Sequence, residues 1–206
     1  MQPTSPIPPY VSLGEPGPAI QHIWFCLHGH DQPMDTLAAQ LVNLDTPERL
    51  LILPQAPGPT PATWFADDDP AAGLLQTRAY LDALATPILA ACAPGTPVTV
   101  LGYGHGATAA TAWLADNPMS YDRLLLYAAV FPAAANRQEL FGQLAKRPIV
   151  VAATTTDIYT PEAEGQSLVQ DLQAAGLDAR LRYVDEGALT LAALGAGAEA
   201  GGLRTQ

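Results

Sequence analysis

The sequence predicts an α/β fold, in which a mostly parallel central sheet carries helices on both of its faces. Short runs of consecutive apolar residues recur along the 206-residue chain, and strands covered on both faces have this pattern. Stretches with helical character separate these runs from about residue 22 onward. Regular alternation of strands and helices is typical of parallel sheets, because a crossover helix connects each strand to a parallel neighbour.

The first half of the chain holds two strands, two helices and a loop rich in proline. Continuous apolar runs predict buried strands at 22–28 and 49–54. Between them, a proline near the start and leucines at helical spacing predict a helix over 31–44. Residues 55–70 combine prolines with two aromatic residues, which predicts a loop. A helix follows over 71–92, and its internal proline is expected to disturb it.

The second half continues the alternation. An apolar run predicts a strand at 98–101, and the alanine-rich helix after it ends before Pro118. Proline and acidic residues in the first turn, with a glycine near the end, predict a helix over 161–177. Polar and apolar residues alternate over 179–185, which predicts an edge strand with one face exposed to solvent. The other expected elements are a strand at 123–131, a short helix at 137–146 and a strand at 147–153.

The length and composition predict one domain that spans residues 1–206. Hydrophobic residues make up 49% of the chain, enough for a sizeable core. The sequence contains no internal repeat and no linker that would divide two domains. Residues 1–20 form a proline-rich N-terminal segment, and we expect 200–206 to be a flexible tail.

The charge balance argues against several classes of partner. The formal net charge is −11, and Lys146 is the only lysine. Nucleic acids and anionic membrane surfaces attract basic patches, so we expect neither as a partner. The N-terminus lacks the basic and apolar regions of a signal peptide, and no stretch is long enough to span a bilayer, so we expect a cytoplasmic protein. Cys26 and Cys92 are expected to be buried free thiols.

The pentapeptide GYGHG at 102–106 lies between the strand at 98–101 and the alanine-rich helix. In the G-x-S-x-G nucleophile elbow, a sharp turn between a strand and a helix carries the attacking serine at its central position. The central residue of this chain is Gly104. The pattern therefore indicates the turn of a serine hydrolase without its nucleophile.

Six stretches, in order between about residues 20 and 190, resemble the small phospholipase/carboxylesterase branch of the α/β-hydrolases. They are LHGH (27–30), LPQAPGP…WFADD (53–68), LGYGHGA (101–107), YAAVFP (127–132), VVAATTTDIYTPEAE (150–164) and LRYVDEGALT (181–190). The resemblance implies the α/β-hydrolase fold and a catalytic triad in the chain order serine, aspartate, histidine. It places these three roles at Gly104, Asp157 and Ala188.

Two of these three triad positions lack the required side chain. Gly104 has no side chain that could attack a substrate, and Ala188 stands where the family delivers its histidine. No histidine follows Asp157, so no shift of the alignment supplies one. Serine hydrolysis is therefore not expected. Asp157 has two open interpretations, a remnant of the triad or an aspartate that caps a turn among neighbouring threonines. The histidines of the chain are His22, His28, His30 and His105.

The resemblance also implies a pocket around Gly104. Backbone N–H groups of His30 and His105 would form its oxyanion hole, which does not depend on side-chain identity. The aromatic pair of the 55–70 loop has a second interpretation, in which buried rings anchor the loop. His28 is expected to be a structural hydrogen bonder. Residues that would line an apolar cleft suited to an acyl chain are Trp64, Phe65, Val130 and Phe131.

We predict neither a metal nor a cofactor. His30, His105 and Asp157 have the residue types of a metal site, but nothing in the sequence shows that they converge. The acidic run 67–69 is expected to be a solvated loop or a helix cap, because the glycine and glutamate spacing of a calcium-binding EF-hand is absent.

Three functions remain open from the sequence. The first is a non-hydrolytic pseudoenzyme, which binds a small acyl or carbonyl compound or acts as a regulator. The second is a hydrolase of the carboxylesterase or thioesterase class that works through His105 or His30, with water as the nucleophile. The third is a structural or interaction protein with a closed pocket, for which a homodimer is one arrangement.

Overall fold

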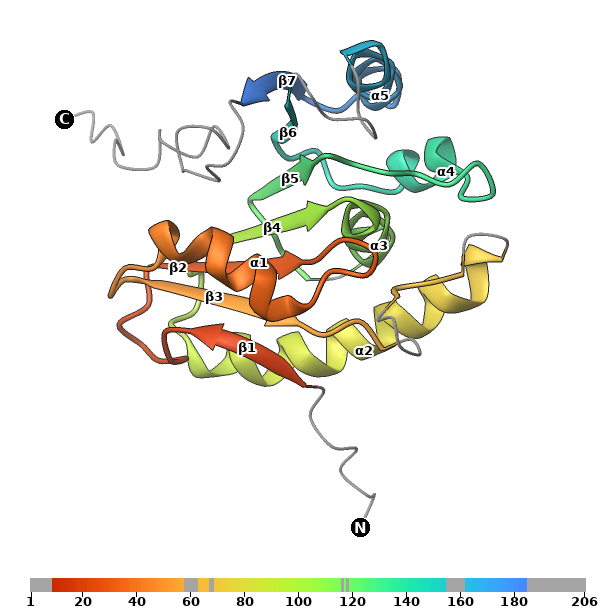
Figure 1. Cartoon of the computed structure of the whole chain (residues 1–206). Coiled ribbons are helices and arrows are strands. Elements are labelled where there is room, and N and C mark those ends of the chain that lie inside the picture. The colour runs from red at the N-terminus through yellow and green to blue at the C-terminus, as the bar shows by residue number, and fades with distance from the viewer. Residues whose placement is uncertain are drawn as a thin grey trace, which may run out of the picture.

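The computed structural model describes residues 9–57, 63–66, 69–115, 117, 119–154 and 162–184. In this part of the chain, seven strands form one sheet in the order β1-β3-β2-β4-β5-β6-β7 (Figure 1). The strands are β1 (Tyr10–Leu13), β2 (His22–Leu27), β3 (Arg49–Pro54), β4 (Val98–Tyr103), β5 (Arg123–Tyr127), β6 (Ile149–Thr154) and β7 (Ala179–Val184). The helices are α1 (Met34–Leu41), the 3₁₀ helix η1 (Val42–Leu44), α2 (Pro70–Ala91), α3 (His105–Leu114), α4 (Arg137–Gly142) and α5 (Glu162–Ala174).

The sheet is parallel from β3 through β7, and β1 is its antiparallel edge strand. Side chains along a strand alternate between its two faces. In β2, Phe25 therefore joins the core on one face and Trp24 joins the core on the other, and both are fully buried. This double burial explains the continuous apolar runs, as predicted.

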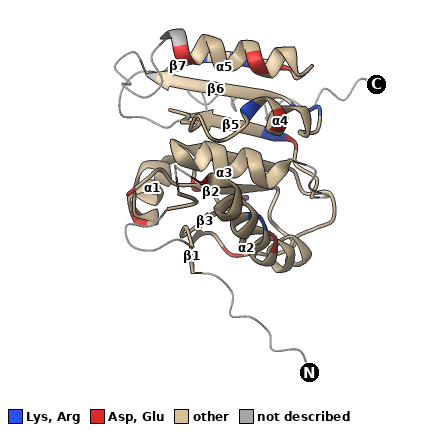
Figure 2. Cartoon of the chain, turned by 90° about the vertical axis from the view of Figure 1, so that its right-hand side faces the viewer, with Lys and Arg blue, Asp and Glu red and all other residues tan. Residues whose placement is uncertain are grey.

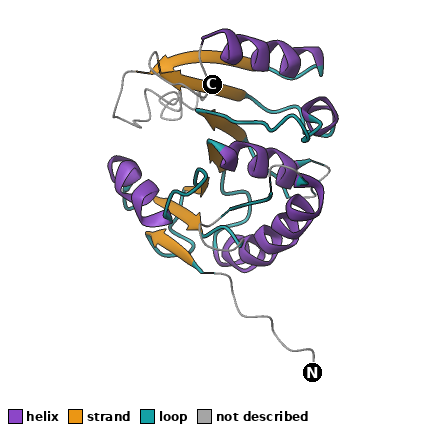
Figure 3. Ribbon diagram, turned by 45° about the vertical axis from the view of Figure 1, so that its right-hand side comes forward, coloured by secondary structure: helices purple, strands orange, loops and turns teal. Residues whose placement is uncertain are grey.

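Helices cover both faces of the sheet, which confirms the predicted α/β architecture. Contacts between α2 and α3, α3 and α4, and α4 and α5 join these four helices into one layer (Figure 2). The helix α1 packs on the opposite face, where Leu37 and Leu41 meet Trp24 (Figure 3). Among the described helices, none combines the length and the apolar character that crossing a membrane requires.

Most expected elements are present. The edge position of β7 is confirmed, and Arg180 and Arg182 on it are exposed. Cys26 and Cys92 are buried and free, as expected. The strand β1 was not predicted, because the prolines around it hide a four-residue strand that pairs with β3 alone.

Two predictions, the end of one strand and the disturbance of one helix by proline, are wrong for local reasons. The strand β5 ends at Tyr127 rather than at 131, because Ala128 takes a left-handed conformation (φ 46°) that turns the chain out of the sheet. The helix α2 continues through Pro87 without interruption. Pro87 and Ala83, whose carbonyl loses its helical partner, are both exposed, so water can bind that carbonyl.

Backbone segments pack closely where α3 begins. A Cβ added to Gly102 of β4 would lie 2.5 Å from the Cα of Ala107. A Cβ added to Gly106 would lie 2.6 Å from the carbonyl oxygen of His28. Real Cβ atoms do not approach backbone this closely, so only glycine allows α3 to sit directly on β2 and β4.

Replacing Gly106 by alanine is therefore expected to lower the free energy of unfolding by at least about 1–3 kcal/mol through overpacking. Gly142→Ala is the matched control, because nothing lies within 4 Å of a Cβ at this helical position. We expect it to be neutral or stabilising by up to about 1 kcal/mol. Urea denaturation of both variants measures the difference, and equal stabilities would contradict the packing argument.

Candidate functional site

The strand order locates the site before any side chain is considered. From β2, the chain proceeds to β3 on one side and later returns to β4 on the other side. At such a switch point the loops that leave the carboxyl ends of the two strands diverge, and ligands of open α/β sheets bind in the crevice between them. The two loops here carry Gly29 and His30 after β2, and Gly104 and His105 after β4.

The turn at Gly104 has the backbone of an elbow. Gly104 is the N-cap of α3 and has φ 55° and ψ −121°, a conformation that disfavours residues with side chains. Its N–H donates to the carbonyl of Tyr127 at 3.0 Å. Its own carbonyl accepts from the N–H groups of Ala107 at 3.0 Å and Val130 at 3.1 Å. Three hydrogen bonds, to Ala107 of α3, to Tyr127 at the end of β5 and to Val130 just after it, therefore hold the turn.

Space remains at Gly104 where a side chain would stand. Among the residues that the structure describes, a Cβ added there would meet one atom within 4 Å, the Cα of Gly29, at an ordinary contact distance of 3.5 Å. A residue with a side chain at this position would thus be strained by its backbone conformation and not by contacts with the described neighbours. A small ligand atom can occupy the same space.

Strained backbone gathers at this edge of the sheet. Besides Gly104, Asp31 (φ 54°) and Ala128 (φ 46°) are left-handed, and these are the described residues other than glycine with positive φ. Asp31 follows β2 and Ala128 follows β5, so the three residues lie after neighbouring strands. Such strain persists where the surrounding structure imposes it, and functional sites are the usual place.

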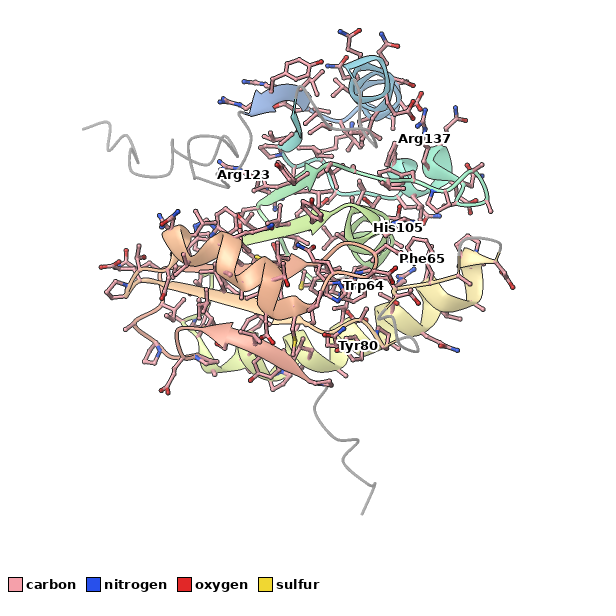
Figure 4. The ribbon with its side chains drawn as sticks, viewed as in Figure 1. Trp64, Phe65, Tyr80, His105, Arg123 and Arg137 are labelled. Carbon is pink, nitrogen blue, oxygen red and sulfur yellow. The ribbon has the colours of Figure 1, made fainter. Side chains whose placement is uncertain are left out.

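An imidazole pair borders the elbow. The ring centroids of His30 and His105 are 5.1 Å apart, and the ring of Phe65 is 5.7 Å from that of His105. Figure 4 shows Phe65 and His105 close together at the start of α3, whereas Arg123 lies toward the other end of the strands. The structure thus brings together three of the residues that the sequence analysis assigned to this site.

Asp31 belongs to the same cluster and was missed. Its Oδ2 lies 3.4 Å from Nε2 of His30, and the two side chains are 53% and 44% exposed. A carboxylate next to an imidazole can orient the ring. In the sequence, the sign of this contact was that His30 and Asp31 are adjacent in HGHD. Only the structure shows that the left-handed backbone of Asp31 brings the two side chains together.

Trp64 is an anchor of its loop. It is 2% exposed, and its Nε1 donates to the carbonyl of His28 at 2.8 Å. Its own carbonyl accepts from Oγ1 of Thr77 at 2.7 Å. Phe65 is 6% exposed. The interpretation of the aromatic pair as buried loop anchors is therefore confirmed, and Phe65 also reaches the imidazole pair.

Of the other four residues assigned to the site, the structure describes two and does not describe the other two. Phe131 packs edge-on against Phe141 of α4, with ring centroids 5.4 Å apart. The carbonyl of Val130 accepts from Oγ1 of Thr108 at 2.6 Å. A role of these two residues in a pocket wall stays a prediction. Asp157 and Ala188 lie outside the described residues.

No metal-binding group is found in the described part of the chain, where three or more histidine, cysteine, aspartate or glutamate side chains would have to converge. The cluster of His30, His105 and Asp31 therefore does not have the geometry of a metal site. The combination of the two histidines with Asp157 cannot be placed, because Asp157 is not among the described residues.

His28 holds the loop after β2, as expected of a structural hydrogen bonder. Its Nδ1 lies 2.8 Å from the carbonyl of Gly29, and its Nε2 accepts from the N–H of Ala56 at 3.0 Å. One ring nitrogen thus donates and the other accepts, which requires the neutral tautomer. Burial lowers the pKa of His28, although the hydrogen bond to Gly29 acts in the opposite direction.

Comparisons with known proteins support the fold. The chain matches no protein-family model and no curated protein. Among solved structures, it is similar to esterase PE8, with a TM-score of 0.68 and 21% identity over 88% of this chain and 90% of that one. The chain has the α/β-hydrolase fold.

Two further structures agree. A phospholipase/carboxylesterase from Dyadobacter fermentans has a TM-score of 0.64 and 15% identity, over 90% of this chain and 92% of that one. Acyl-protein thioesterase 2 from Zea mays has a TM-score of 0.62 and 16% identity, over 88% and 90%. The resemblance read from six short stretches of sequence therefore predicted the fold correctly.

The neutral state of His28 predicts a pH-dependent stability. Since the pKa of His28 is lower in the folded state, its contribution is present above the unfolded pKa of about 6.5 and decreases as the pH falls below it. The free energy of unfolding is expected to fall by up to about 1.4 kcal/mol per pH unit on this account. Urea denaturation between about pH 7 and pH 5 measures it, above the range where most carboxylates titrate.

His28→Gln removes the titrating ring, so its stability should depend less on pH than that of the wild type. His22→Gln is the matched control, because His22 begins β2, the strand that ends just before His28, and its Nε2 lies 2.8 Å from Oγ1 of Thr99. Curves for His28→Gln and the wild type that stay parallel over this range would show that His28 is not the group responsible.

Proposed function

We propose that this chain is a non-hydrolytic relative of the phospholipase/carboxylesterase type, which binds a small acyl or carbonyl compound at the elbow around Gly104. The observation that carries the proposal is a glycine at the centre of an elbow whose backbone is otherwise complete. The absence of any histidine after Asp157 supports it independently, because two separate losses do not arise from one substitution.

The retained geometry favours an oxygen-bearing ligand. The N-terminus of a helix carries partial positive charge and attracts carboxylate or polarised carbonyl oxygens. The helix α3 has ten residues and begins directly after Gly104, beside the space that a serine side chain would fill. A carbonyl held there by backbone donors would meet no nucleophile from residue 104.

Hydrolysis and binding can be tested on the same protein. We expect purified protein to hydrolyse p-nitrophenyl butyrate and p-nitrophenyl hexanoate no faster than buffer, because residue 104 offers no attacking oxygen. We expect hexanoate to raise the melting temperature in a saturable manner, because ligands that bind the folded state stabilise it.

Gly104→Leu should abolish the hexanoate effect by filling the space at the elbow. Gly95→Leu is the matched control, since Gly95 also has a positive φ (82°) but no described residue lies within 4 Å of a Cβ there. A positive φ strains a residue with a side chain at either position, by about 1–3 kcal/mol. The proposal would be overturned by ester turnover that Gly104→Leu abolishes, or by unchanged hexanoate binding in that variant.

The pair of His30 and Asp31 favours a second candidate function, a hydrolase with water as its nucleophile. Here His30 would take a proton from a water molecule while the oxygen of that water attacks an ester carbonyl. His30 would then return the proton to the alcohol that leaves as the acyl C–O bond breaks, and Asp31 would orient the ring. The 3.4 Å contact between Asp31 and His30, beside His105, supports this candidate.

The second candidate predicts turnover of p-nitrophenyl acetate that rises with pH through the range where imidazoles titrate, because only neutral imidazole accepts a proton. His30→Gln should reduce kcat by about a hundredfold or more, whereas His22→Gln should leave it unchanged. Turnover that survives in a His30→Gln/His105→Gln double variant would exclude both histidines as the base.

A further inference from the structure

A groove lies on the helical layer, apart from the elbow. It has a volume of about 510 Å³ and is bordered by α2 on one side and by α4 on the other, and Ala112 of α3 contributes to its lining. Figure 2 views this layer and shows α2, α3 and α4 side by side. The helix α3 carries no charged residue, so the base of the groove is apolar.

The α2 wall presents a leucine to solvent. Leu75 is 69% exposed, although its neighbour Leu74 is 8% exposed and belongs to the main core. Both residues line the groove. The other large hydrophobic residues exposed in the described part of the chain are Val42 at 57% and Tyr183 at 44%. Leu75 is thus the most exposed of the three, and it borders an apolar depression.

The same wall carries a positive charge. Arg78 follows Leu75 by three residues, so the two share one face of the helix, and both line the groove. Within the part of the chain that the structure describes, no ion pair joins Arg78 to a carboxylate. Arg137 differs, since its guanidinium pairs with Asp171 at 2.5 Å and with Glu164 at 3.5 Å.

The α4 wall also combines a leucine with a charged residue, but its charge is negative. Leu140 and Glu139 both line the groove. Glu139 is exposed, and its Oε2 accepts from Nδ2 of Asn136 at 3.2 Å, which holds the carboxylate at the start of α4. Each wall therefore carries leucine and one charged side chain, and the two charges have opposite signs.

We propose that this groove is the interface of a homodimer, in which α2 of each copy packs against α4 of the other. In a two-fold symmetric interface, a contact between one residue and another occurs twice with the roles exchanged. Leu75 then meets Leu140 of the second copy, and Arg78 meets its Glu139. This proposal does not depend on the function proposed for the elbow.

The opposite charges of the two walls, and not the net charge of the chain, favour a second copy as the occupant of the groove. Each copy has a net charge of −11, so two copies repel one another at long range. Association then requires opposite charges that meet at short range, and the α2 and α4 walls supply both signs within one chain. A partner that fits the groove must offer a leucine beside a cation and a leucine beside an anion, and this chain does so.

Sedimentation velocity of the full chain, up to roughly 100 µM, covers the range of micromolar dissociation constants and tests the proposal. We expect the wild type to dimerise reversibly and Leu75→Glu to remain monomeric, because a carboxylate would replace the apolar contact. Val42→Glu is the matched control, since Val42 is similarly exposed but lies in η1, on the opposite face of the sheet. It should dimerise like the wild type.

Charge reversal tests the pairing itself. Arg78→Glu and Glu139→Arg should each weaken the dimer by about tenfold or more, because each single change places like charges in contact. The double variant Arg78→Glu/Glu139→Arg should restore the dimer to within about threefold of the wild type. Circular dichroism and the melting temperature establish that each variant is folded.

A wild type that stays monomeric over the whole concentration range would overturn the proposal. So would a Leu75→Glu variant that dimerises normally, or a double variant no better than the single ones. Each of these outcomes would show that a second copy of the chain does not bind in the groove in the proposed way.

Discussion

The close contact of α3 with the strands beneath it determines the geometry of the candidate site. A helix approaches a strand this closely only where no Cβ intervenes, and Gly102 and Gly106 meet that condition on either side of the turn. The contact fixes where α3 begins, and therefore where Gly104 and His105 lie at the carboxyl end of β4. The same contact sets the helix against the carbonyl of His28, so it also determines how near the loop after β2 approaches.

The turn at Gly104 has the backbone of a nucleophile elbow, although residue 104 has no side chain that could attack a substrate. The turn retains its left-handed backbone, its hydrogen bonds to Tyr127 and Val130, and the space for a side chain. These features are properties of the backbone and of glycine packing, so they do not depend on a nucleophile. A scaffold of this kind can hold an oxygen atom of a ligand without breaking a bond in it, which is the physical basis of the proposed binding function.

The loops around the elbow are organised by buried polar contacts as well as by apolar packing. Neutral His28 joins the loop after β2 to the chain at Ala56, and Trp64 joins the aromatic loop to the carbonyl of His28. Because these groups are buried, loss of either partner would leave an unsatisfied donor or acceptor. The imidazoles of His30 and His105 therefore sit on a rigid base, while the Asp31–His30 pair itself remains open to solvent.

The sequence by itself determined the α/β class, most strands and helices, and which residues stand at the positions compared with a catalytic triad. The class follows from local periodicity, and the residue identities follow directly from the chain, in which Gly104 is the central residue of the turn and no histidine follows Asp157. Only the tertiary structure decided that His30, His105 and Phe65 meet, that Asp31 joins them, and that β5 ends at Tyr127. The approach of His30 to His105 depends on loops brought together by the pairing of β2 with β4. The contact of Asp31 with His30 depends on the left-handed backbone of Asp31, and the end of β5 depends on a left-handed backbone at Ala128, which is not a glycine.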